Sequence, residues 1–185
     1  MTDRSTLIAL LATRSTKRGQ FTLASGKTSD LYIDARLTTM SPEGLRLIGS
    51  LGVAVLRSEG WEVDAVGGLT LGADPIAYAI SHASASTARP LRAFTVRKQA
   101  KTHGTGKLIE GPFVAGDQVA IVEDVVTTGR STLQAIDAVR AAGGKVVGVL
   151  ALVDREEGGR EAIEESGVRV VSIVRASEIT AILPK

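Results

Sequence analysis

The apolar runs along the chain predict the strands of a parallel sheet. The runs 119–122 and 146–153 contain no polar side chain, which is typical of strands that are buried on both faces. We predict further strands over 64–66, 91–96, 108–111 and 168–174. Such runs, separated by helical segments, indicate an α/β protein.

Helical spacing of apolar residues predicts the segments between the strands. Leu133, Ile136 and Val139 fall on one face of a helix over 132–142, which a pair of glycines ends. A short helix over 160–166 and an amphipathic helix within residues 1–19 are predicted in the same way.

Two helices carry a cap followed by proline. We predict a helix that starts at Ser41-Pro42 and ends at Gly60, because serine is a good N-cap and proline suits the first helical position. By the same argument, Asp74-Pro75 caps a helix that reaches about residue 85.

The N-terminal part of the chain predicts an appendage to the sheet. The segments 21–23 and 31–34 alternate between apolar and polar residues and flank a polar turn that contains glycine, so we interpret them as a hairpin. We expect one domain over residues 1–185, with a hood over a site formed mainly by residues 1–40. A plain edge hairpin is the alternative.

Composition narrows the class of protein. The chain has 185 residues, of which 44% are hydrophobic and 23% charged, with a net charge of +2 and no cysteine. It is therefore expected to be globular and cytoplasmic, without disulfides or thiolate chemistry. No run approaches the ~18 apolar residues of a membrane span. Aromatic residues, at 3%, offer few stacking platforms, so no nucleic-acid partner is expected.

The stretch VAIVEDVVTTGRS, residues 119–131, carries the most distinctive chemistry. Glu123 and Asp124 follow a buried strand, at the end where open parallel sheets bind ligands. Carboxylates there can accept hydrogen bonds from vicinal hydroxyls, as in a ribose, or hold the waters of Mg²⁺. The turn that follows precedes a helix N-terminus, which favours an anion such as phosphate.

The residues alone leave another interpretation open. A buried strand with two solvated acids and an ordinary turn would give the same pattern. Two other phosphate motifs are excluded, because neither G-x-x-x-x-G-K-[ST] nor G-x-G-x-x-G occurs here.

Basic residues concentrate in residues 97–107, after a predicted strand. This segment contains Arg97, Lys98, Lys101, His103 and Lys107 together with glycines, and no acid. Such a loop suits a lid that closes on a polyphosphate. A solvated basic turn is the simpler alternative.

Two further loops lie at predicted strand ends. Arg155 follows the run 146–153 and could offer its planar guanidinium to a carboxylate; it could equally pair with Glu156 or Glu157. The glycine-rich loop 67–73, which has no lysine, is a second candidate anion site or a tight turn that packs a helix.

The stretch 119–131 resembles the phosphoribosyl pyrophosphate (PRPP) signature of type I phosphoribosyltransferases. Three other segments resemble the orotate phosphoribosyltransferase branch: FTLASGKTSDLYIDAR, RKQAKTHGTGKLIEG and VDREEGG. The resemblance implies the type I phosphoribosyltransferase fold, a mainly parallel sheet flanked by helices with a small N-terminal hood. It implies transfer of ribose 5-phosphate from PRPP to orotate, giving orotidine 5′-monophosphate and pyrophosphate.

The resemblance also implies roles for individual residues. Lys101 and Asp124 would be catalytic, and Thr127 and Arg155 would bind orotate. The residues implied to bind PRPP are Arg97, Lys98, Lys101, His103, Glu123, Asp124, Val125, Val126, Thr127, Thr128, Gly129, Arg130 and Ser131. No residue would ligate a metal directly, since Mg²⁺ would bind mainly through PRPP.

The family resemblance further implies a homodimer in which the lid reaches the neighbouring site. Two alternatives use the same fold: a purine phosphoribosyltransferase, and a PRPP-sensing regulator without catalysis.

Overall fold

The computed structural model describes residues 2–22, 28–99 and 107–183. Within them, the chain forms a six-stranded sheet and a separate two-stranded sheet. Across the larger sheet, the strands lie in the order β5 (Ile109–Glu110), β4 (Arg92–Val96), β3 (Ala65–Leu69), β6 (Gln118–Val126), β7 (Lys145–Asp154) and β8 (Val170–Arg175). All neighbours pair in parallel except the edge strand β5, which is antiparallel to β4. The predicted α/β class and mainly parallel sheet are confirmed.

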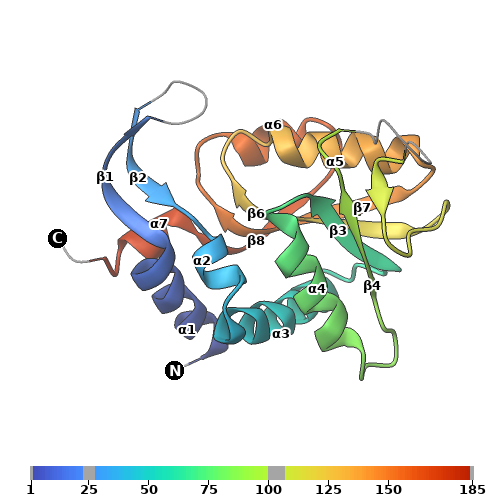
Figure 1. Cartoon of the computed structure of the whole chain (residues 1–185), viewed down its shortest axis with the longest axis horizontal. Coiled ribbons are helices and arrows are strands. Elements are labelled where there is room, and N and C mark those ends of the chain that lie inside the picture. Colours follow the sequence, from blue (N-terminus) through green and yellow to red (C-terminus); the bar gives the residue numbers. More distant parts are fainter. Residues whose placement is uncertain (1, 23–27, 100–106, 184–185) are drawn as a thin grey trace.

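Helices cover both faces of the sheet (Figure 1). One layer contains α1 (Asp3–Leu10), α3 (Pro42–Ser58), α4 (Ala73–Ser84) and α7 (Ala176–Thr180). The other contains α5 (Arg130–Ala141) and α6 (Gly159–Glu164). Because β3, β6 and β7 are joined to the next parallel strand through helices, their carboxyl ends meet at one edge of the sheet.

The alternation of side chains along the strands produces two cores. Ala120 and Val122 of β6 belong to the cluster that packs on the α3 side. Val119 and Ile121, between and beside them, belong to the cluster that packs on the α5 side. Successive residues of a strand point to opposite faces, so a run without polar residues is what a strand between two helical layers requires.

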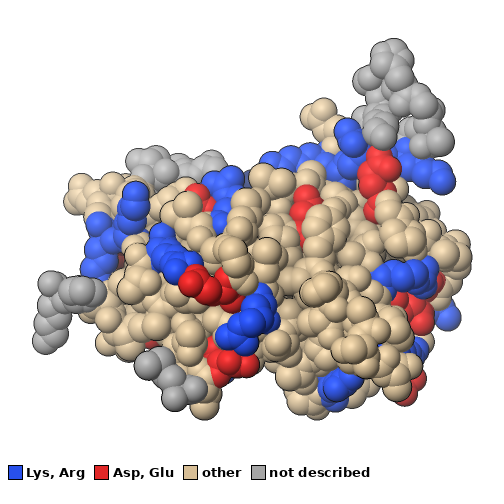
Figure 2. All heavy atoms as spheres, turned by 60° about the horizontal axis from the view of Figure 1, so that its bottom comes forward, with Lys and Arg blue, Asp and Glu red and all other residues tan. Residues whose placement is uncertain are grey.

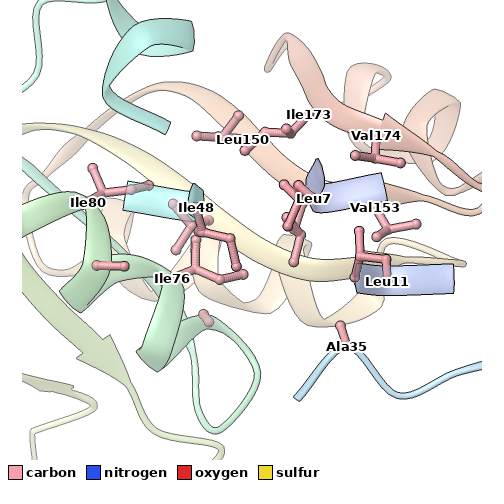
Figure 3. Packing of buried hydrophobic residues seen from close by; sticks show 14 of the residues in the cluster. Leu7, Leu11, Ala35, Ile48, Ile76, Ile80, Leu150, Val153, Ile173 and Val174 are labelled. Atoms are coloured by element: carbon pink, nitrogen blue, oxygen red, sulfur yellow. The ribbon is translucent and has the colours of Figure 1, made fainter. Parts of the chain in front are cut away.

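Figure 3 shows the larger core, where helical side chains meet the sheet. Leu7 and Leu11 lie beside Val153 and Val174, while Ile48 and Ile76 pack nearer Leu150. Fully buried leucines therefore anchor the N-terminal helix to the sheet, and the hood follows this helix directly in the chain.

The hood is the hairpin of β1 (Thr16–Thr22) and β2 (Thr28–Ile33), followed by the short helix α2 (Arg36–Thr39). It stands beside the main sheet rather than in it (Figure 1). The predicted hairpin is confirmed, but its first strand starts at Thr16 because the N-terminal helix, with its π-helical last turn (Leu11–Ser15), ends there. Residues 23–27, including part of FTLASG, lie outside the described residues.

One predicted cap is confirmed and one is wrong. The Ser41 hydroxyl accepts a hydrogen bond from the N–H of Gly44 at 3.1 Å, as a serine N-cap does. Asp74, in contrast, lies inside α4, whose N-cap is Gly72. Its carboxylate accepts hydrogen bonds from the hydroxyls of Thr70, in the turn before the helix, and Thr95, on β4, instead.

Charged side chains of both signs are interspersed on the face that Figure 2 shows. Ion pairs such as Arg14–Glu43, at 2.6 Å, join the N-terminal helical segment to α3. Exposed pairs of this kind contribute little to stability individually. In the described part of the chain, no helix is both long and apolar enough to span a membrane.

Candidate active site

A pocket of about 290 Å³ lies where the hood faces the carboxyl ends of β3 and β6. The hood contributes residues 32–36, the end of β3 and the turn after it contribute 69–72, and β6 contributes 123–125. Lys98 and Ser131 complete its lining. This is the edge of the sheet at which the sequence predicted a ligand.

The two acids lie in the last part of strand β6, which continues to Val126. Glu123 is only 4% exposed, whereas Asp124 is half-buried. Burial, followed by the charge of neighbouring Asp124, raises the pKa of the Glu123 carboxyl to about 7. The pair therefore binds a proton far more readily than two solvated acids would, and it favours hydroxyl donors or a cation in the pocket.

Helix α5 supplies hydrogen bonds to Glu123. The hydroxyls of Ser131 and Thr132 both donate to Oε2 of Glu123, at 2.7 and 2.9 Å. The sequence assigned Ser131 to an anion at the turn; in this structure its hydroxyl joins the first turn of α5 to the acid pair. These hydrogen bonds therefore join the acid pair of β6 to the first turn of α5, the two parts of the predicted site.

The turn between β6 and α5 is held in one shape by its glycine. Gly129 has a φ of 77° and is the N-cap of α5, a left-handed conformation that glycine adopts without strain. A Cβ at this position would also lie 2.8 Å from the carbonyl oxygen of Gly159. Thr127 is half-buried and Thr128 exposed, so residues 127–130 present a polar turn at the start of a helix, which suits an anion.

Arg97 and Lys98 follow β4 beside this turn. The N–H of Arg97 donates to the carbonyl of Leu108 at 2.8 Å, and its guanidinium lies 3.6 Å from Glu110. The Gln134 amide of α5 donates to the carbonyl of Lys98 at 3.0 Å. These bonds hold the two ends of the basic segment together, and Lys98 brings the first of them to the pocket. Lys101 and His103 lie outside the described residues.

The turn after β3 packs against Asp124. Residues Gly67 and Gly68, predicted as part of a loop, belong to β3, and the turn is limited to residues 70–72, with a cis peptide bond between Thr70 and Leu71. A Cβ added at Gly72 would lie 2.6 Å from the carboxylate atoms of Asp124. Glycine at this position is what allows the Asp124 carboxylate to lie over the turn.

Replacing Gly72 by alanine should therefore displace Asp124 and weaken binding in the pocket. We expect the Kd of a ligand held by Asp124 to rise by roughly tenfold, the cost of one lost charge-assisted hydrogen bond. Gly52→Ala is the control, because its Cβ would crowd the buried side chain of Ile80 and not Asp124. Calorimetry that showed equal Kd values for the two variants would contradict this contact's role.

Arg155 lies at the end of β7, outside the lining of this pocket. It is 7% exposed, and its Nη2 donates to Glu157 at 2.5 Å and to the carbonyl of Leu31 in the hood at 3.2 Å. The pairing with Glu157, one of the alternatives left open by the sequence, is present. The guanidinium therefore connects the end of the sheet to the hood.

The hood contributes residues to the pocket that the sequence did not single out. Asp34 and Arg36 form a two-pronged ion pair, with distances of 2.8 and 3.0 Å. The hydrogen bond from Arg36 lowers the pKa of Asp34, and the same bond raises the pKa of Arg36. The motif LYIDAR contained these residues, but only the tertiary structure shows that they face Asp124.

The sheet order and the acid pair at its edge define the class of protein. A model of the phosphoribosyl transferase domain family matches residues 40–182. An orotate phosphoribosyltransferase from Aquifex aeolicus is 47% identical over 182 residues, which cover 97% of this chain and 98% of the relative. The chain belongs to the orotate phosphoribosyltransferase family.

Solved structures agree with this assignment. Mycobacterium tuberculosis orotate phosphoribosyltransferase in complex with Fe(III) dicitrate superposes with a TM-score of 0.84 and 45% identity, covering 96% of this chain and 99% of that chain. The structure of the same enzyme in complex with PRPP gives a TM-score of 0.81 and 41% identity, covering 97% and 99%. The fold is that of the type I phosphoribosyltransferases.

Proposed function

We propose that the chain is an enzyme that transfers ribose 5-phosphate from PRPP to orotate, giving orotidine 5′-monophosphate and pyrophosphate, a step in the synthesis of pyrimidine nucleotides. The observation that carries the proposal is the acid pair of β6 joined to the N-terminal turn of α5 in one pocket. The near full-length likeness to orotate phosphoribosyltransferases supports it.

The pocket and the turn beside it are proposed to bind the two ends of a sugar phosphate. We propose that Glu123 and Asp124 accept hydrogen bonds from the ribose hydroxyls. The residues proposed to surround the 5′-phosphate and the adjoining backbone are Val125, Val126, Thr127, Thr128, Gly129, Arg130 and Ser131. Binding energy from the phosphate then holds the reacting carbon in place.

The reaction separates charge, and the pocket residues complement it. As the bond between ribose and pyrophosphate loosens, positive charge develops on the sugar ring, while a ring nitrogen of orotate approaches the opposite face of the reacting carbon. The carboxylate of Asp124 lies at this pocket and stabilises the cationic ring. Negative charge develops on the departing pyrophosphate.

Basic residues after β4 are proposed to stabilise that leaving group. Lys98 lines the pocket, and Arg97 precedes it directly after β4; by family resemblance Arg97, Lys101 and His103 act with it. A cationic segment over the site neutralises developing charge and excludes water, which would otherwise hydrolyse PRPP. Lys101 is the proposed catalytic residue of this segment.

Mg²⁺ fits the donors of the pocket as a partner of PRPP. Glu123 and Asp124 are adjacent carboxylates at the pocket, and the described residues contain no cluster of three or more side chains that could hold a metal by themselves. Their carboxylates can accept hydrogen bonds from the waters of an Mg²⁺ ion that the oxygens of PRPP hold. When bound, the ion would neutralise charge on the pyrophosphate.

Orotate differs from purine bases by its carboxylate, and Arg155 is the group proposed to recognise it. Its guanidinium is buried between β7 and the hood, where a planar fork suits a carboxylate. Thr127, on the turn after β6, is proposed to bind the same base. Both assignments come from the family resemblance.

We further propose a homodimer in which the basic segment serves the neighbouring site. Leu37, Met40, Leu71 and Tyr78 are each about half exposed, and they stand on α2, α4 and the turn at the pocket. Exposed large apolar side chains are common at protein interfaces. A cytoplasmic location stays a prediction from the cysteine-free sequence.

Consumption of orotate tests the proposed function. Orotate absorbance should fall only when PRPP and Mg²⁺ are both present, and adenine or hypoxanthine should give no product. Arg155→Gln should raise the KM for orotate by about tenfold or more, because a charged hydrogen bond is lost, while Arg169→Gln, in an exposed ion pair with Glu59, should not. Turnover of a purine base instead of orotate would favour the purine enzyme, and PRPP binding without turnover would favour a regulator.

A further inference from the structure

A buried threonine supports the acid pair from behind the pocket. Thr132 is 0% exposed, and its Oγ1 donates to Oε2 of Glu123 at 2.9 Å. Ser131 donates to the same oxygen at 2.7 Å. Two donors on one oxygen restrict the rotation of the carboxylate, because turning it would break both charge-assisted hydrogen bonds.

The two hydroxyls differ in what else they can touch. Ser131 lines the pocket and can turn toward a ligand, but Thr132 does not line it. Threonine is also branched at Cβ, so its hydroxyl direction in a helix is restricted to few rotamers. Any effect of Thr132 on a ligand in the pocket must therefore pass through Glu123.

We propose that Thr132 is a positioning residue for the reaction, holding the Glu123 carboxylate in the orientation that receives the ribose hydroxyls of PRPP. The proposal rests on the proposed function for the identity of the ligand. The first turn of α5 would then both bind the phosphate and orient Glu123, the group that binds the sugar.

The hydroxyl also acts on the charge of Glu123. Burial and Asp124 raise the pKa of this carboxyl, while the hydrogen bonds from Ser131 and Thr132 lower it. The other charged groups that line the pocket, among the described residues, are Asp34 and Arg36 from the hood and Lys98 after β4. Loss of the Thr132 hydroxyl should move the pKa of Glu123 further upward.

Variants of Thr132 that keep or remove the hydroxyl test the proposal. Thr132→Val keeps the shape and should raise the calorimetric Kd for PRPP about tenfold, the usual cost of a lost hydrogen bond to a charged group, while Thr132→Ser should stay within about twofold of the natural chain. In Thr132→Val, the acidic limb of kcat/KM for PRPP should move to higher pH, because ionised Glu123 is then reached only at higher pH.

Thr38→Val is the matched control. Thr38 is also 0% exposed, its hydroxyl is bonded to Ser15 at 2.7 Å, and neither residue lines the pocket. It should lose stability as Thr132→Val does, with no change in the Kd for PRPP or in the pH profile. Thr132→Ala supplies a second hydroxyl-free variant if the valine variant does not fold.

A double mutant separates positioning from general disturbance. In a Glu123→Gln background, Thr132→Val should have no further effect on the Kd for PRPP, because the effect passes through the carboxylate. A folded hydroxyl-free variant with unchanged Kd and pH profile would overturn the proposal, as would an equal loss in both backgrounds. PRPP calorimetry needs no orotate turnover, so it distinguishes a failure of the role of Thr132 from a failure of the proposed base specificity.

Discussion

Replacing Asp124 by asparagine should lower kcat/KM for PRPP by roughly 10²-fold, the scale lost with one preorganised charge-stabilising group. The carboxylate lies at the end of β6, where its Oδ1 accepts a hydrogen bond from the N–H of Val125 at 2.8 Å. Asparagine keeps that acceptor and the shape of the side chain, but it removes the charge that faces the cationic sugar. Steady-state kinetics with PRPP as the varied substrate measure the effect.

The control for this variant removes an acid from the neighbouring helix. Asp137 is exposed on α5 and lies outside the pocket, so Asp137→Asn changes the net charge equally without touching the site. It should keep kcat/KM close to that of the natural chain. Equal activity of the two variants would remove Asp124 from the mechanism.

Replacing Lys101 by alanine should lower kcat by roughly 10²-fold or more, again the scale of one charge-stabilising group, with the fold unchanged. The reason is the negative charge that gathers on pyrophosphate as it departs. Because that charge is larger in the transition state than in bound PRPP, the loss should fall on kcat more than on KM. Lys145→Ala, at the exposed start of β7 and far from the pocket edge, is the control.

Mixed dimers test whether the lysine serves the neighbouring site. A Lys101→Ala chain and an Asp124→Asn chain should each be roughly 10²-fold less active alone. Combined in one dimer, they would rebuild one site with both natural groups, and part of the activity should return. Verified mixed dimers with no recovery would mean that each site uses its own basic segment.

The sequence predicted the part of the site that a single continuous stretch forms. The run 119–122, the acids and the turn are neighbours along the chain, so strand, acid pair and helix start follow from local pattern alone. The structure confirms β6 followed by α5, with Gly129 in a left-handed turn. The sequence placed the end of this strand at Val122, because two adjacent acids are unusual in a buried strand. In the structure β6 continues to Val126, and Glu123 pairs with Ala151 of β7.

Contacts between distant residues could not be predicted in the same way. Arg155 reaches the carbonyl of Leu31, which lies 124 residues earlier, and no local pattern encodes that pairing. Asp74 looks like a helix cap in sequence, yet Thr95 of β4 bonds to it in the fold. The burial of Glu123 likewise depends on α5 folding back over the strand end, which supplies the two hydroxyls that offset its desolvation.

Calorimetric titration of the natural chain with PRPP in the presence of Mg²⁺ shows whether the pocket at the end of β6 holds a sugar phosphate. We expect saturable binding of one PRPP per chain, weakened strongly by Asp124→Asn and unchanged by Asp137→Asn. Folded protein that gave no binding heat over a wide range of temperatures and PRPP concentrations would contradict it, because the pocket at the end of β6 would then not be a sugar-phosphate site.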